Sequence, residues 1–362
     1  MIRFGIIGCG LMGKSHATSL LEGKIPGATL TAVCDIDPKV HEWAKEKSAD
    51  IKTFTTTVEL FAAGVVDAVI IATPHYEHPI YAMEAMDNKV HVLIEKPAGV
   101  FTKNVREMNE KAKTAGVTFA IMYQHRTNPL YRKMREMIQS GELGELKRNS
   151  WLITEWYRPQ AYYDMGGWRA TWKGEGGGVL INQCPHNLDL WQWICGMPTK
   201  VTAFTHNGKW RNIEVEDDVT AYVEYENGAT GIFVTTIADC PGTNRFEILG
   251  DLGKLVCENG ELVHYKLEMS EPEFSRTNKE FFGHPKYERI VIDCPSEVSF
   301  HNGITQAFVN KINGQGELFA KGEEGINGLT ISNAMHLSSW VGKTIELPLD
   351  EDLFIAELEK RF

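Results

Sequence analysis

Apolar and polar positions follow two different rhythms along the chain, and the first rhythm occupies the N-terminal third. Continuous apolar runs typical of buried strands lie at residues 3–8, 28–35, 67–74, 91–97 and 118–124. Helical patterns stand between them, at residues 12–23, 38–47, 78–88 and 102–116. Apolar strands separated by helices predict a parallel sheet with helices on both faces, because both faces of such a sheet have to be covered.

The second rhythm follows a predicted helix at residues 128–143 and a predicted strand at 146–156. Short β-rich runs then succeed one another, joined by turn signals such as Asn227-Gly228 and Asn259-Gly260. This pattern predicts an open, mostly antiparallel sheet with few helices. One of those helices, at residues 330–341, has the spacing of a core-facing helix.

The length of 362 residues is comfortable for two domains. The change of rhythm divides the α/β chain into residues 1–123, a doubly wound parallel sheet, and residues 124–362, an α+β domain.

Three glycines open an otherwise apolar segment at residues 176–193. The segment carries Asn182, His186 and Asp189, at spacings of four and three. In a helix these positions share one face, so we predict a helix whose polar face looks into a cavity.

Charge and composition exclude several classes of protein. The formal net charge of −11 and the lack of clustered Lys and Arg argue against a nucleic-acid partner. No run of about 18 apolar residues suggests a membrane span, and the apolar N-terminus is too short and glycine-rich for a signal peptide.

Seven scattered cysteines without a CxxC pair favour a reducing cytoplasm over disulfides or a zinc site. For Cys184, an inert buried thiol is favoured over a reactive one, because reactive thiols need electropositive surroundings.

A full GxGxxG motif follows the first strand and opens the first helix, which is the context of a dinucleotide-binding Rossmann turn. Gly8 allows the tight turn, Gly10 lets the backbone approach a pyrophosphate, and Gly13 permits close helix packing. Leu11 and Met12 lie between the second and third glycines and begin the helix, whose N-terminus attracts the phosphates.

Asp35 ends the second strand, where a carboxylate accepts hydrogen bonds from ribose hydroxyls and repels a 2′-phosphate. No Lys or Arg follows until Lys39, so NAD is favoured over NADP. Asp37 is the alternative ribose ligand, although an N-cap of the next helix is the favoured interpretation.

Two later strands end in polar residues at the edge of the sheet where ligands of such folds bind. Thr73 and His78 follow one strand, and Glu95 and Lys96 follow the next. For Glu95 and Lys96, the alternative that the sequence leaves open is a Lys–Glu pair on the surface, outside any binding site. His75 and His78 have no third ligand nearby, so no metal site is expected.

Taken in order, GxGxMGxxH at residues 8–16, ATPxxxH at 72–78, EKP at 95–97 and WR followed by GGGxLxxxxxHxxDL at 168–190 resemble the Gfo/Idh/MocA family. The resemblance implies an NAD(P)-dependent oxidoreductase in which Lys96 binds cofactor and substrate and assists proton transfer. It also implies that His186 is a catalytic acid/base.

Many family members have an aspartate where this chain has Asn182, and an amide carries no proton or charge at neutral pH. Asn182 would orient the substrate instead, and Asp189 is either a substitute carboxylate or a structural residue. The resemblance further assigns cofactor contacts to Trp168 and Arg169.

The aromatic stretch before the glycines favours a carbohydrate substrate, because aromatic faces pack on the C–H faces of sugar rings. Tyr157 in this stretch, with Arg126 and Asn128 earlier, are candidates for binding it. The resemblance points to oxidation of a ring hydroxyl, with C3 of a glycoside favoured.

The alternatives are an inositol dehydrogenase-like activity, NAD-dependent glycoside cleavage without net redox change, and a non-catalytic NAD-responsive binding protein. We also expect a homo-oligomer formed through the C-terminal sheet, whose open face needs a cover.

Overall fold

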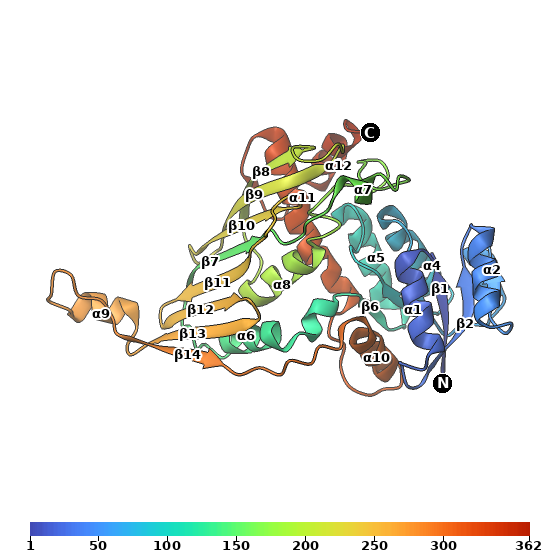
Figure 1. The fold of residues 1–362 in the computed structure, drawn as a ribbon, viewed down its shortest axis with the longest axis horizontal. Coiled ribbons are helices and arrows are strands. Elements are labelled where there is room, and N and C mark those ends of the chain that lie inside the picture. Colours follow the sequence, from blue (N-terminus) through green and yellow to red (C-terminus); the bar gives the residue numbers. More distant parts are fainter. The chain divides into compact units, whose positions relative to one another are not determined.

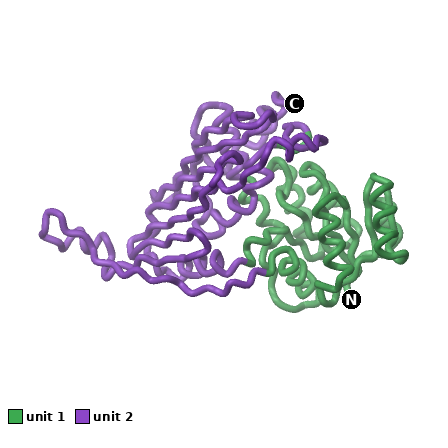
Figure 2. The backbone as a smooth tube through the Cα atoms, viewed as in Figure 1, with its two compact units in different colours: residues 1–127, 174–176, 299–329 green, residues 128–173, 177–298, 330–362 purple.

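The computed structural model describes residues 1–362, which fold into two compact units (Figure 2). Unit 1 comprises Met1–Thr127, Gly174–Gly176 and Ser299–Leu329. Unit 2 comprises Asn128–Lys173, Gly177–Val298 and Thr330–Phe362. Because two later segments join unit 1, the units are not two continuous stretches of chain.

Unit 1 contains a six-stranded parallel sheet in the order β3-β2-β1-β4-β5-β6, as the apolar runs predict. Its strands are β1 (Ile2–Ile7), β2 (Ala28–Cys34), β3 (Lys52–Phe54), β4 (Ala68–Ile71), β5 (His91–Ile94) and β6 (Phe119–Ile121). Its helices are α1 (Leu11–Leu21), α2 (Pro38–Lys47), α3 (Thr57–Ala62), α4 (His78–Asp87), α5 (Thr102–Ala115) and α10 (Phe300–Ile312). Short 3₁₀ turns η1 (His75–Glu77), η2 (Gln124–Thr127) and η3 (Gly322–Glu324) complete the unit. The order is that of a dinucleotide-binding fold, in which ligands bind where the strand order reverses, between β1 and β4.

A late helix completes the core of unit 1. Ile304, Phe308 and Val309 of α10 are buried together with the apolar residues of β1 and β2. The rings of Phe308 and Phe4 have centroids 6.1 Å apart. Burial of this apolar face explains why residues 299–329 fold with the N-terminal sheet.

Unit 2 is built on a nine-stranded sheet in the order β14-β13-β12-β11-β7-β10-β9-β8-β15 (Figure 1). The strands are β7 (Leu146–Ile153), β8 (Lys200–Asn207), β9 (Glu216–Glu224), β10 (Thr230–Thr236), β11 (Asn244–Gly250), β12 (Gly253–Glu258), β13 (Glu261–Leu267), β14 (Tyr287–Ile292) and β15 (Ile345–Glu346). The helices are α6 (Pro129–Gln139), α7 (Gln160–Tyr163), α8 (Pro185–Cys195), α9 (Glu271–Thr277) and α12 (Glu351–Glu359), and α11 (Gly325–Val341) is shared with unit 1.

Both predicted hairpins of unit 2 are confirmed. Asn227-Gly228 joins the antiparallel strands β9 and β10, and Asn259-Gly260 joins β12 and β13. All neighbouring strands are antiparallel except β7 and β10, which run parallel. The sheet is therefore mixed but mostly antiparallel, as expected.

The predicted helix over residues 176–193 is correct only in its second half, since α8 begins at Pro185. Residues 178–184 form turns, in which the Asn182 N–H donates to the Gly178 carbonyl at 3.0 Å. Proline has no N–H to continue a helical ladder and disfavours helical geometry at the residue before it. Asn182 thus precedes the helix that carries His186 and Asp189.

An arm extends from unit 2 between β13 and β14 and carries α9, which buries none of its side chains (Figure 1). Phe281 and Phe282 follow α9 and are 98% and 95% exposed.

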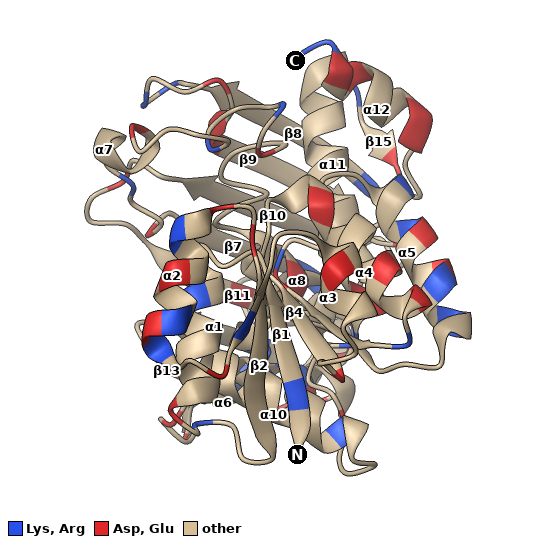
Figure 3. Ribbon diagram, turned by 90° about the vertical axis from the view of Figure 1, so that its right-hand side faces the viewer, with Lys and Arg blue, Asp and Glu red and all other residues tan.

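Charged side chains of both signs share the helix surfaces of the molecule. Lys and Arg are interspersed with Asp and Glu on α2 and α5, without a continuous basic face in this view (Figure 3). No helix combines the length and the apolar character that crossing a bilayer requires.

Candidate active site

The glycine turn after β1 brings backbone segments into a contact that no larger residue permits. Gly8 has φ +79°, and a Cβ atom on Gly13 would lie 2.2 Å from the Gly8 carbonyl oxygen. A Cβ on Gly10 would meet nothing within 4 Å. The turn is therefore tight at Gly8 and Gly13 and open at Gly10, which is the arrangement expected for backbone approach to a pyrophosphate.

The N-terminus of α1 adjoins this turn and is free of negative side chains. Leu11 is 82% exposed, Met12 is half-buried, and no acidic residue lies in the first turn of the helix. Unpaired N–H groups and the helix dipole give such an end a partial positive charge, which suits phosphate groups.

The Asp35 carboxylate is held in place by two backbone N–H groups. Cys9 donates to Oδ2 at 2.7 Å and Asp37 donates to Oδ1 at 2.9 Å. Each oxygen keeps a lone pair for a ribose hydroxyl. Asp37 instead caps α2 by accepting from Lys39 N–H, which confirms the N-cap interpretation.

A cavity of about 310 Å³ opens beside Asp35. It is lined by residues from the ends of β1, β2 and β4 and from the loops that follow β3 and β4: Ile7, Gly8, Cys34, Asp35, Ile36, Thr55, Thr56, Thr57, Thr73, Pro74, Glu77 and Tyr81. The open turn at Gly10, the free helix end and the fixed carboxylate together fit a dinucleotide with an unphosphorylated ribose.

His78 links the loops that follow β4 and β5. Its ring nitrogens lie 2.8 Å from the Thr73 carbonyl and 2.7 Å from the Pro97 carbonyl, and the ring is buried. Burial lowers the pKa of His78, although hydrogen bonds to both carbonyls oppose the shift. The His78 ring thus holds these two loops together.

Lys96 follows a buried carboxylate whose two oxygens both have partners in the protein. Glu95 Oε1 lies 2.8 Å from His16 Nε2, and Glu95 Oε2 accepts the Lys96 backbone N–H at 3.1 Å. Burial alone would raise the pKa of Glu95, but His16, Lys96 and His301 lower it to about 2. Glu95 is therefore an anion at neutral pH, placed at the carboxyl edge of the parallel sheet beside the half-buried Lys96.

In unit 2, a second buried carboxylate holds the turns that carry Asn182. Gly178 N–H donates to Glu216 Oε2 at 2.8 Å, and Leu180 N–H donates to Oε1 at 3.0 Å. His336 Nε2 lies 3.0 Å from the same Oε2, and both Glu216 and His336 are buried. The Glu216 carboxylate thus fixes the backbone directly before Asn182.

His186 and Asp189 lie one turn apart at the start of α8, and both are buried. Asp189 Oδ1 accepts from Gln192 Nε2 at 3.1 Å. Cys184 is buried with Sγ 3.1 Å from Thr235 Oγ1, which fits an inert thiol.

Trp168 and Arg169 lie in the loop before the glycine segment. The Arg169 guanidinium lies 4.6 Å from the centre of the Trp168 ring. Arg169 Nε is buried without a hydrogen-bond partner in the protein. A buried donor of this kind is costly unless a ligand satisfies it.

Comparison with known proteins agrees with this geometry. The family model for oxidoreductases with an NAD-binding Rossmann fold matches residues 2–123. The model for the GFO/IDH/MocA C-terminal domain matches residues 131–256. The chain belongs to the Gfo/Idh/MocA family.

Relatives in the family are similar over much of their length. The scyllo-inositol 2-dehydrogenase (NAD(+)) of Bacillus subtilis is 26% identical over 70% of this chain and 73% of its own. The D-glucoside 3-dehydrogenase of Escherichia coli is 28% identical over 63% of this chain and 68% of its own. The structure of WlbA dehydrogenase from Bordetella pertussis, in complex with NADH and UDP-GlcNAcA, has a TM-score of 0.81 at 27% identity and covers 96% of this chain and 98% of that chain. The predicted fold and the assignment as an NAD-binding oxidoreductase are confirmed.

Two residues expected to bind substrate in this Gfo/Idh/MocA protein have structural contacts instead. Arg126 is buried in unit 1, where it binds the Phe319 carbonyl at 3.2 Å and the Glu324 carboxylate. Asn128 caps α6 by accepting from Leu130 N–H at 2.9 Å. These contacts support their units, and substrate binding by either residue stays a prediction. Tyr157 is partly exposed, with the Arg211 guanidinium 5.3 Å from its ring.

The sequence analysis missed Glu216 and His336. Glu216 begins a β-rich run and His336 interrupts an apolar helix, so both stand where apolar residues are the norm. A charged residue at a core position needs a partner, and that requirement was the available signal.

Replacing the second and the third glycine of the motif by alanine, one at a time, should separate folding from cofactor binding. Gly13→Ala drives a Cβ atom into the Gly8 carbonyl and should lower the free energy of unfolding by about 1–3 kcal/mol. Gly10→Ala meets open space in the protein and should leave stability unchanged, yet weaken NAD binding about tenfold or more by occupying the path of the pyrophosphate. Urea unfolding and NAD titration measure the two effects. Unchanged NAD affinity in Gly10→Ala would contradict the assigned site.

The stability of the protein should fall in acid through His125. Burial, with the positive charges of His301 and Lys96, lowers the pKa of His125 to about 4, below its ordinary 6.5. As the pH falls from 6.5 to 4, the unfolded chain takes up this proton first, so the free energy of unfolding falls by up to about 1.4 kcal/mol per pH unit. Glu95 acts in the same direction between pH 4.5 and 2.

His125→Gln should reduce the loss between pH 6.5 and 4, measured by urea unfolding at several pH values. His284→Gln, on an exposed loop of unit 2, is the matched control and should keep it. Equal slopes for the wild type and His125→Gln would refute this assignment.

Proposed function

We propose that this protein oxidises a ring hydroxyl of a sugar or glycoside, with C3 favoured, and uses NAD as the electron acceptor. The observation that carries the proposal is the fit of the glycine turn and the fixed Asp35 carboxylate to NAD, with Lys96 at the same edge of the sheet. Two relatives named above are dehydrogenases of a glucoside and of an inositol, which supports a polyhydroxylated ring as substrate.

The residues proposed to hold NAD are those that the sequence motifs predict. Gly8, Gly10 and Gly13, with Leu11 and Met12, would meet the pyrophosphate, and Asp35 would bind the ribose. Thr73, Glu95 and Lys96 would border the nicotinamide side, supported by His78, and Trp168 and Arg169 are proposed as further cofactor contacts. When bound, NAD supplies the hydride acceptor.

The proposed acid/base residues are Lys96 and His186. Either side chain can take the hydroxyl proton while the carbon is oxidised, and a positioned acid/base group of this kind is worth about 10²–10⁴-fold in rate. Asn182 would orient the substrate by hydrogen bonds, since its amide cannot accept the proton. The burial of Asp189 and its contact with Gln192 favour a structural role.

A panel assay tests the proposal. The protein should convert NAD to NADH with at least one sugar, glycoside or inositol, in a stoichiometric amount and with an intact keto product. Absorbance of NADH and mass spectrometry of the product are the measurements. Release of an aglycone without net NADH would instead support redox-assisted glycoside cleavage, the alternative, and an inositol preference would favour the polyol dehydrogenase.

Lys96→Met is the diagnostic variant for this assay. The change removes the ammonium group but retains an unbranched chain, so turnover should fall by at least about 10²-fold while NAD binding remains measurable. Lys103→Met is the control: it removes the same charge from α5 of the same unit, away from the proposed site. The variant should have normal turnover. Turnover unchanged in Lys96→Met removes this residue from the mechanism.

We also propose that the protein acts in the cytoplasm as a homo-oligomer that associates through the nine-stranded sheet. Exposed apolar side chains lie on its neighbouring strands: Phe204 on β8 (65% exposed), Tyr222 on β9 (42%) and Ile232 on β10 (40%). Tyr222 and Ile232 are direct cross-strand partners. Apolar groups that share one face of an open sheet favour burial against a second copy.

Ile232→Glu should shift the protein from an oligomer to a monomer in size-exclusion chromatography with light scattering, because the new charge would be buried at the contact. Val58→Glu, at an exposed apolar position of α3 in unit 1, is the control and should leave the oligomer intact. A wild-type monomer, or an oligomer that survives Ile232→Glu, contradicts association through this face.

A further inference from the structure

Three half-buried arginines in unit 2 have no carboxylate partner. Arg158, Arg169 and Arg211 lie in the two loops that follow β7 and β8. The hydrogen bonds of Arg158 and Arg211 go to backbone carbonyls, and the buried Nε of Arg169 has no partner in the protein. By contrast, Arg245 in the same unit pairs with glutamates. Unpaired cations are unexpected in a chain of net charge −11 that has many carboxylates to offer.

Aromatic rings fix the position of these guanidinium groups. Arg158 and Arg169 both lie against the ring of Tyr162, at 5.4 and 5.9 Å from its centre. Arg211 lies 5.3 Å from the centre of the Tyr157 ring. Stacking occupies the faces of a guanidinium and leaves its N–H edges available to a ligand.

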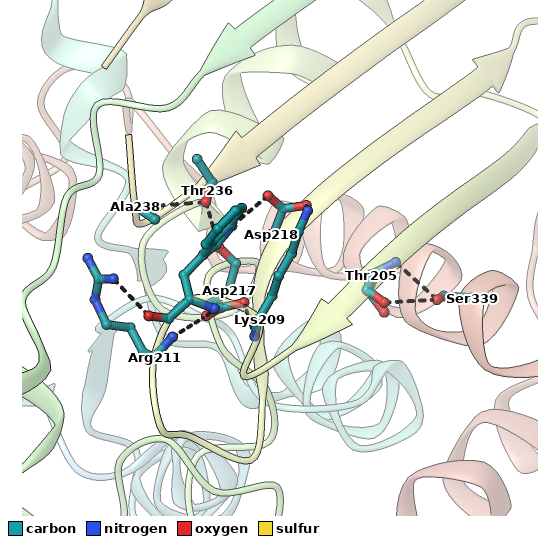
Figure 4. A network of polar contacts seen from close by, with 9 residues as sticks. Thr205, Lys209, Arg211, Asp217, Asp218, Thr236, Ala238 and Ser339 are labelled. Carbon is teal, nitrogen blue, oxygen red and sulfur yellow. Dashed lines mark hydrogen bonds and ion pairs between the residues drawn. The ribbon is translucent and has the colours of Figure 1, made fainter. Parts of the chain in front are cut away.

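The loop that presents Arg211 is held rigid by a buried carboxylate. Asp217 accepts backbone N–H groups from Lys209, Trp210 and Arg211 at 3.0, 2.7 and 2.9 Å (Figure 4). Arg211 Nε then donates to the Arg158 carbonyl at 2.7 Å, which joins the two loops. The arginines are therefore positioned before a ligand arrives, and little ordering entropy remains to oppose binding.

We propose that Arg158 and Arg211, with the rings of Tyr157 and Tyr162, bind an anionic group of the sugar substrate, a carboxylate or a phosphate. The proposal rests on the proposed function and narrows its substrate class. Planar guanidinium groups match both anions with paired N–H donors, and aromatic faces beside them suit the sugar ring. Arg169 also lies near the Tyr162 ring, but we assign it to cofactor binding and not to this site.

Equilibrium titration of the full-length protein with NAD tests the proposal independently of turnover. The probes are glucose, glucuronate and glucose 6-phosphate, which share one ring and differ in charge, and inorganic phosphate as a competitor. We expect at least one anionic sugar to bind about tenfold or more tighter than glucose, and phosphate to compete with it. Raising the ionic strength from about 0.05 to about 0.5 M should reduce this preference. The tighter of the two anionic sugars identifies the carboxylate or the phosphate as the preferred group.

Arg158→Gln and Arg211→Gln should each reduce the preference for the anionic sugar and the competition by phosphate about tenfold, with NAD affinity unchanged. Arg211→Lys keeps the charge without the planar fork and should recover part of the preference. Arg276→Gln, on the exposed helix α9, makes the same change of net charge and should have no effect.

Equal binding of glucose and its anionic counterparts, without phosphate competition in the wild type, overturns the anion site whether or not the variants fold. A loss of NAD affinity in Arg158→Gln and Arg211→Gln, with the sugar preference unchanged, also overturns it and assigns the arginines to the cofactor. An intact anion preference without NADH formation from any sugar leaves the anion site standing and contradicts the proposed function instead.

Discussion

The close backbone contact between Gly13 and Gly8 is the constraint on which the N-terminal unit depends. A side chain at Gly13 would overlap the Gly8 carbonyl, so only glycine lets α1 begin this near to β1. The same turn points the Cys9 N–H at Asp35, which fixes the carboxylate that we propose as the ribose ligand. Helix position, phosphate path and ribose recognition therefore follow from one contact, and a change there alters all three together.

Buried carboxylates perform the corresponding task at three other places. Glu95 is held beside Lys96 by His16, Glu216 binds the turns before Asn182, and Asp217 binds the loop of Arg211. Burial of a carboxylate costs several kcal/mol unless hydrogen bonds satisfy it, so each of these anions fixes the groups that surround it. Burial in fact raises the pKa of Asp217, against the three backbone N–H groups that lower it. These anions thus fix loops and turns that carry residues of the proposed sites.

The sequence was sufficient for those parts of the structure that local patterns determine. Strand and helix periods, the glycine turn and the Asp37 N-cap depend on residues close together in the chain, and the structure confirms them. The local spacing of residues does not show which distant parts of the chain meet in the folded protein. Thus Phe308 completes the N-terminal core from late in the chain, Arg126 is bound by Glu324, and Glu216 finds its backbone partners far from its own strand. The start of α8 was missed for a local reason, because the pattern of polar residues outweighed the proline in the middle of the segment.

The buried Glu216 carboxylate gives a physical reason for an asparagine at position 182. The Glu216 carboxylate already holds the backbone of Gly178, whose carbonyl accepts the Asn182 N–H. An aspartate at this half-buried position would place a second carboxylate on a turn that is fixed by a buried anion, and like charges repel. Asparagine offers a donor and an acceptor without that repulsion. In the proposed mechanism, proton transfer is then assigned to His186 and Lys96, and Asn182 is assigned the orientation of the substrate.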